Sequence, residues 1–196
     1  MFIKLTARTC LTRLISGLLL TCFLMAGRAT AAPALDSKTI DALVGRYFGP
    51  DAVAFTDDTP EMPRYLWGDF NGDGRPDLVI PLDVEKARSS IGRFAITLIP
   101  LHGGKTIMEE IGQHCLALGI LQGRDNASQP FVASRVFFLY DCFSGYAKVA
   151  PHAAMARSAG LDLVRDAISL DLENGGQTLI YWHGDTYRWR LLQNGD

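Results

Sequence analysis

Apolar positions near residue 40 follow the period of an α-helix. The i, i+3, i+4, i+7 spacing, which lines up side chains on one helical face, is followed by Ile40, Leu43, Val44 and Tyr47. Asp36 or Ser37 can cap the start of this helix, because a side-chain oxygen there accepts a free backbone N–H. Gly49-Pro50 marks its end. We therefore expect a short N-terminal helix with one buried face.

Most of the remaining chain follows strand patterns. Short runs of β-branched, aromatic or other apolar residues bounded by turn residues predict strands over residues 65–67, 78–82, 94–101, 115–121, 136–140, 167–172, 178–182 and 187–192. Asn174-Gly175 and Gly184-Asp185 supply the positive φ that tight hairpins need. Residues 151–162 fit either a short helix or a loop. The pattern predicts one α+β domain, with a mostly antiparallel β-sheet and the short N-terminal helix.

The first 31 residues have the pattern of a cleaved export signal. They hold four basic residues and no acidic one, and an apolar run covers residues 14–26. Ala29 and Ala31 fit a signal-peptidase site, so we expect a signal peptide of residues 1–31 and a mature domain of residues 32–196. A membrane anchor is one alternative, although a span needs about 20 apolar residues. A lipoprotein modified at Cys22 is another. In a bacterial host, cleavage predicts a periplasmic or secreted protein.

The predicted mature chain is acidic. The whole sequence of 196 residues has a formal net charge of -2, and beyond residue 31 it holds 15 basic and 21 acidic residues. Nucleic acids and anionic membranes usually require a basic patch, so we expect neither as a partner. The hydrophobic content of 48% and the charged content of 20% are those of a globular domain rather than a disordered one.

Two cysteines remain in the predicted mature chain, Cys115 and Cys142. An even number of cysteines in an oxidising compartment predicts a structural disulfide. Two buried free thiols are the alternative. The chain has no C-x-x-C sequence, which gives little support to a redox centre or a zinc site.

One acidic loop has the spacing of a cation site. Oxygen-bearing side chains stand at positions 1, 3, 5 and 9 of a loop with glycine at position 6, and they are Asp69, Asn71, Asp73 and Asp77. Alternate residues of a curled loop can direct their oxygens at one centre, and the carbonyl of Arg75 can add another. Calcium binds six to eight such oxygens, whereas magnesium requires a more compact geometry. We expect calcium here, between two strands; a metal-free hairpin turn is the alternative.

The loop resembles the FG-GAP (VCBS, integrin α-type) calcium loop. The resemblance rests on about 20 residues, the D-x-N-G-D-G-x-x-D sequence that begins at Asp69 and the apolar strand that follows. It implies side-chain ligands from Asp69, Asn71, Asp73 and Asp77 and a carbonyl ligand from Arg75. Position 12 is Ile80 instead of the glutamate of an EF-hand. A β-propeller is not implied, because propellers of this type carry several repeats and this chain carries one.

The C-terminal hairpin is rich in aromatic residues. Period-2 alternation places Tyr187, Trp189 and Leu191 on one face of a strand and two arginines on the other. With residues 181–187 (Tyr-Trp-His-Gly-Asp-Thr-Tyr), the chain resembles small exported bacterial proteins that pair one such loop with an aromatic hairpin. A core face is the simpler interpretation; a contact surface for a glycan or another protein is the alternative.

These patterns favour an exported, calcium-stabilised binding or interaction module without catalysis. Its partner would be another exported protein or a glycan. The first alternative is an inhibitor or immunity protein against a secreted or cell-wall enzyme. It draws on residues 142–146, whose Ser-Gly dipeptide resembles the loop by which some periplasmic lysozyme inhibitors enter an enzyme cleft. The second is a hydrolase, although no G-x-S-x-G or H-E-x-x-H sequence is present.

Overall fold

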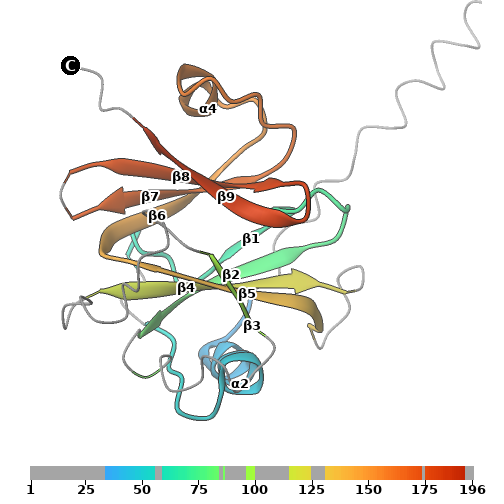
Figure 1. Cartoon of the computed structure of the whole chain (residues 1–196). Helices are drawn as coiled ribbons and strands as arrows, with labels where there is room; N and C mark the ends of the chain where they lie inside the picture. The colour runs from blue at the N-terminus through green and yellow to red at the C-terminus, as the bar shows by residue number, and fades with distance from the viewer. Residues whose placement is uncertain are drawn as a thin grey trace, which may run out of the picture. The chain divides into compact units, whose positions relative to one another are not determined.

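Two β-sheets lie face to face in the computed structural model, with a helix on the outer side of each (Figure 1). The structure describes residues 34–55, 59–83, 86, 96–99, 115–124, 131–173 and 175–192. The unit Ala34–Asp196 forms one cluster of contacts. The predicted signal peptide lies outside the described residues. Within the described part, no helix is long and apolar enough to cross a membrane.

The first sheet has five strands in the order β1-β2-β4-β5-β3. Their bounds are β1 Leu66–Gly68, β2 Asp77–Asp83, β3 Ile96–Ile99, β4 Leu116–Gly123 and β5 Ala133–Asp141. All pairs are antiparallel except β3 with β5, which is parallel. Strands β2 and β4 are apolar on both faces because both faces of this sheet are covered.

The second sheet has four antiparallel strands in sequence order. Their bounds are β6 Phe143–Val149, β7 Ala167–Leu172, β8 Gln177–His183 and β9 Thr186–Leu192. Gly184, with a φ of 69°, makes the tight turn between β8 and β9. Such a φ strains residues with a Cβ, which explains the glycine at this turn.

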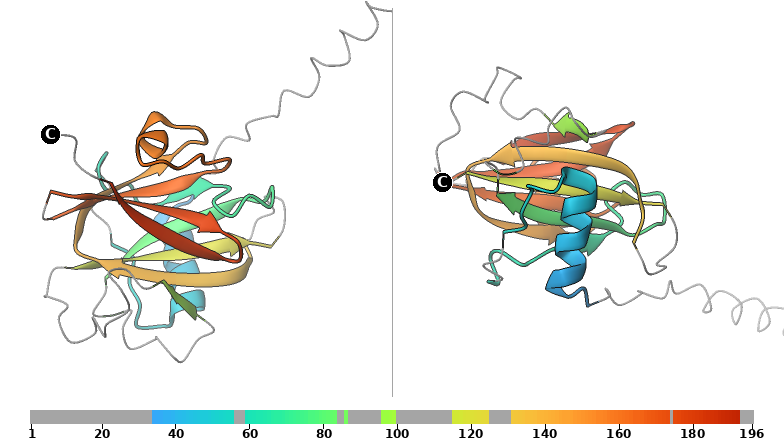
Figure 2. Two further views of the ribbon diagram at one scale, coloured as in Figure 1. Left: turned by 45° about the horizontal axis from the view of Figure 1, so that its top comes forward. Right: turned by 90° about the horizontal axis from the view of Figure 1, so that it is seen from below.

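Helix α2, Ser37–Phe48, covers the outer face of the five-stranded sheet (Figure 2). Asp36 caps it, because its Oδ1 accepts the Thr39 N–H at 2.8 Å. A Cβ at Gly119 of β4 would lie 2.4 Å from the Phe48 ring. Glycine at this position therefore lets the helix pack closely against the sheet.

The main core lies between the two sheets. Side chains that alternate along β4 and β5 meet those of the second sheet there, and the fully buried members include Leu118, Ile120, Phe137, Ile168 and Ile180. A smaller apolar layer on the far face of the second sheet packs against the short helix α4, Ala154–Ser158. The second sheet is therefore also covered on both faces.

The structure confirms the N-terminal helix and eight strands that the sequence predicted, with shifted bounds. It also confirms the predicted Cys115–Cys142 disulfide. Of the predicted strand 94–101, the ends lie outside the described residues. One expectation was wrong, because the chain forms two sheets instead of one. The segment 142–146, whose resemblance to an inhibitor loop is the basis of the first alternative, lies largely in strand β6. Residues 151–162, which fitted either a short helix or a loop, contain the short helix α4.

Candidate functional site

The acidic loop joins β1 to β2, as the sequence predicted. Leu66 and Gly68 pair with Val79 and Asp77, so the loop closes an antiparallel pair. Gly72 and Gly74 have φ values of 76° and 79°. These left-handed conformations curl the chain tightly, and a side chain with a Cβ would strain them.

Within the loop, acidic and amide oxygens accept backbone N–H groups. Asp69 accepts from Gly72 at 2.7 Å through Oδ1 and from Gly74 at 3.0 Å through Oδ2. Asn71 and Asp73 each accept from the residue two positions ahead, at 3.0 Å and 2.8 Å. The side chains of Asn71 and Asp73 also meet, at 3.2 Å. These bonds hold three of the five predicted ligand residues in fixed positions around the curled backbone.

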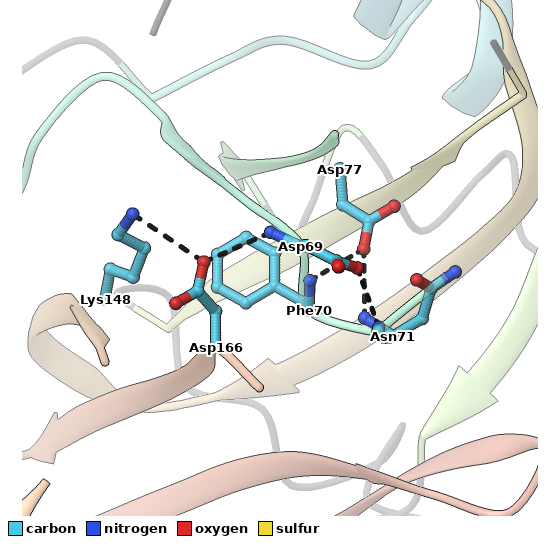
Figure 3. Close-up of polar contacts among 7 residues, drawn as sticks. Asp69, Phe70, Asn71, Asp77, Lys148 and Asp166 are labelled. Carbon is cyan, nitrogen blue, oxygen red and sulfur yellow. Dashed lines mark hydrogen bonds and ion pairs between the residues drawn. The ribbon is translucent and has the colours of Figure 1, made fainter. Parts of the chain in front are cut away.

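Asp77 holds the base of the loop from inside the protein. Its side chain is fully buried, and Oδ2 accepts the N–H groups of Phe70 at 2.9 Å and Asn71 at 3.1 Å (Figure 3). Oδ1 accepts the N–H of Gly123 on β4 at 3.1 Å. One carboxylate thus fixes the start of the loop and the end of the neighbouring strand β4.

Burial changes the ionisation of this carboxyl group. Loss of water raises the pKa of Asp77 to about 7, while the three backbone N–H donors oppose the shift by favouring the ionised form. The nearby Asp73 adds to the upward pKa shift because its negative charge repels a second one. A cation at the loop would favour the ionised form of Asp77.

The second sheet contacts the loop through the segment that leads into β7. The Asp69 N–H donates to Asp166 Oδ2 at 3.1 Å, and Lys148 of β6 lies 3.7 Å from the same oxygen (Figure 3). Arg165 Nη1 donates to the Asn71 carbonyl at 2.5 Å. A Cβ at Gly68 would lie 2.6 Å from Asp166 Oδ2, so only glycine allows this approach. The loop therefore joins the two sheets.

The aromatic hairpin also reaches the base of the loop. The Tyr187 hydroxyl on β9 lies 3.4 Å from the side-chain nitrogen of Gln122, the residue before Gly123 on β4. Burial raises the pKa of Tyr187 well above its ordinary value, and the charge of Asp77 raises it further. The Tyr187 hydroxyl on β9 and the Asp77 carboxylate at the loop base thus interact electrostatically.

The donor set of the loop suits a hard cation, although the described residues contain no group of three or more His, Cys, Asp or Glu side chains arranged to hold a metal. The Asn71 amide and the Arg75 carbonyl are further oxygen donors of the loop. Each oxygen of Asp69 accepts one hydrogen bond in the structure, and an ionised carboxylate oxygen has a second lone pair for a cation. Oxygen ligands of this kind are those that calcium prefers.

The hairpin faces divide largely as the sequence predicted. Tyr187 and Trp189 face the core between the sheets, while Arg188 and Arg190 are exposed. Leu191 departs from the prediction, because its side chain is 51% exposed. It lies on β9, an edge strand of its sheet, where cover is incomplete.

Arg165 and Asp166 are site residues that the sequence did not single out. They lie more than 90 positions from the loop residues they contact. An Arg-Asp dipeptide directly before a predicted strand is a common surface pattern. Its role depends on which strand end the fold brings next to the loop.

No family model, curated protein or solved structure matches this chain.

Proposed function

We propose that this protein is an exported, calcium-stabilised binding module without a catalytic role. The observation that carries the proposal is the loop of residues 69–77, an acidic, oxygen-rich turn that contacts both sheets. A cation bound there would neutralise carboxylates of the loop and strengthen the contact between the two layers of the fold.

The ligands would come from the residues that the sequence predicted. Asp69, Asn71 and Asp73 would bind through side-chain oxygens and Arg75 through its carbonyl. Asp77 would hold the loop base and offer the remaining lone pair of Oδ1. Calcium would supply charge neutralisation and a fixed loop geometry; this chain's own residues supply the link to the second sheet.

Export is supported by the Cys115–Cys142 disulfide, which is typical of a non-reducing compartment. The sequence pattern of residues 1–31 supports it independently. The inhibitor alternative draws no support from Ser144-Gly145. This dipeptide lies within β6, at a bulge where Gly145 packs against the Glu61 carbonyl and Asp171.

Thermal unfolding tests the proposal. Extracellular calcium modules often have dissociation constants of about 10⁻⁴–10⁻³ M. Saturation at about 100 times the dissociation constant adds about 2.7 kcal/mol to the free energy of unfolding. For a domain of this size we expect calcium to raise the Tm by roughly 5–10 °C.

The matched variants are Asp73→Ala in the loop and Asp41→Ala on the exposed face of α2. The first should lose the calcium-induced shift of the Tm, and the second should keep it. A Tm that does not respond to calcium in the unmodified protein, or an undiminished response in Asp73→Ala, would contradict the proposal.

A further inference from the structure

The outer face of the β8–β9 hairpin presents two arginines beside an aromatic ring. Arg188 pairs in register with Tyr181, and Arg190 pairs with Leu179, so both arginines lie on the same face. Both are exposed. Within the described part of the chain, neither guanidinium has an ion-pair or hydrogen-bond partner. This local positive charge contrasts with the acidic composition of the predicted mature chain.

A hollow of about 380 Å³ opens at this hairpin. It is lined by Tyr181, Thr186, Tyr187, Arg188 and Trp189. The volume lies at the lower end of the range for small-molecule sites, about 300–1,000 Å³. The lining offers an aromatic ring, a hydroxyl and a guanidinium close together.

The hairpin is held rigidly from behind. Trp182 and Tyr187 on its inner face make edge contacts with the Phe137 ring of β5, at centroid distances of 5.8 Å and 5.0 Å. Arg135 donates to the Asp185 carbonyl in the hairpin turn at 2.8 Å and lies over the Trp182 ring. A surface held in this way loses little conformational entropy when a ligand binds.

We propose that this hollow binds a carboxylated saccharide. The proposal rests on the proposed function only in its assignment as a binding module. A guanidinium matches a carboxylate with two parallel N–H donors, and Arg188 has its donors available at the rim. A sugar ring has an apolar C–H face, which can pack on Tyr181, and a hydroxyl edge, which can hydrogen-bond to Thr186.

A saccharide fits this hollow better than an acidic peptide. The lining residues come from one hairpin and border an open hollow of about 380 Å³, which suits a short saccharide. An extended peptide would pair with the backbone of the edge strand β9, a mode that uses main-chain hydrogen bonds and does not require the exposed guanidiniums. Arg188 and Arg190 provide two exposed guanidiniums on one face, which suits one or two carboxylates rather than a long acidic segment.

Calorimetric titration of the mature protein with digalacturonate tests the proposal, with its methyl ester as the neutral match. We expect heat from the acid and about tenfold weaker binding, or none, for the ester. Arg188→Gln and Tyr181→Ala should each weaken binding by about tenfold or more. Arg46→Gln, an exposed arginine on α2, should leave binding unchanged.

Three results would overturn the saccharide site. They are no heat with digalacturonate, equal affinity for the ester, and equal competition by hexaglutamate, which would indicate an acidic-peptide site. Circular dichroism spectra of the variants separate lost binding from lost folding. A parallel calcium titration keeps the two proposals apart: saccharide binding without a calcium response would contradict only the calcium site, and the reverse would contradict only the hollow.

Discussion

At the scale of single residues, Asp77 is the most constrained polar group of the loop. Its carboxylate is fully buried and accepts three backbone N–H groups from two parts of the chain. A carboxyl group can accept through both oxygens, whereas an amide accepts through only one. The position therefore favours aspartate because of these hydrogen bonds as well as for any bound cation.

Asp77→Asn should lower the free energy of unfolding by about 1–3 kcal/mol, because its amide nitrogen cannot accept one of these N–H groups. Urea unfolding at about pH 5, below the folded pKa of Asp77 of about 7, measures the change. Asp41→Asn on the exposed face of α2 is the matched control and should have little effect. Equal stability of the Asp77 variant and the unmodified protein would show that these three bonds contribute nothing net.

The raised pKa of Asp77 also predicts a pH dependence in calcium-free protein. The folded pKa of about 7 lies above the ordinary value of 3.8, so the folded state binds this proton more tightly. The associated stability is present below about pH 4 and is lost as the pH rises through about 7. The free energy of unfolding, measured in a chelator, should therefore fall more between about pH 5 and about pH 8 in the unmodified protein than in Asp77→Asn. Identical pH profiles would contradict the pKa assignment.

At the scale of elements, the segment before β7 connects the loop to the second sheet. Asp166 accepts the Asp69 N–H and pairs with Lys148 of β6, while Arg165 contacts the Asn71 carbonyl. The contacts come from three elements that are distant in the chain. Loop geometry and sheet packing are therefore coupled through two consecutive side chains.

Asp166→Ala should destabilise the protein by about 1–3 kcal/mol, because the half-buried Asp69 N–H loses its acceptor. Asp166→Asn should cost less, since it keeps an acceptor oxygen and loses only the ion pair. Denaturant unfolding gives both values. Asp162→Ala is the control, because Asp162 is an exposed acid on the same connection. If Asp162→Ala destabilised as much as Asp166→Ala, the contact with the loop would not be the cause.

At the scale of the whole molecule, the disulfide joins the residue before β4 to the residue between β5 and β6. It therefore lies where the chain passes from the first sheet to the second. The two cysteines lie 27 positions apart in the chain. The disulfide between them closes a loop, which reduces the chain entropy of the unfolded state.

The double variant Cys115→Ser, Cys142→Ser should lose about 3–4 kcal/mol of unfolding free energy. Denaturant unfolding of this variant and of the non-reduced protein measures the difference. A reducing agent should destabilise only the unmodified protein. An effect of the agent on the double variant would indicate a cause other than the disulfide, and equal stability of the two proteins would contradict the predicted contribution.

The sequence by itself determined the features that depend on neighbouring residues. Asp36 and Gly49 bound helix α2, Gly72 and Gly74 curl the acidic loop, and Gly184 turns the last hairpin. The disulfide was also predictable, because only one pair of cysteines lies beyond the predicted signal peptide. Each of these depends on backbone preferences within a few residues or on a count.

Only the tertiary structure decided how these pieces combine. Strand β6 was missed because Ser144 and Gly145 interrupt its apolar pattern, and its place depends on pairing with β7. The roles of Arg165 and Asp166 depend on contacts across 94 and 97 positions. No local preference encodes such contacts; they arise because burying both faces of two sheets brings these strand ends together.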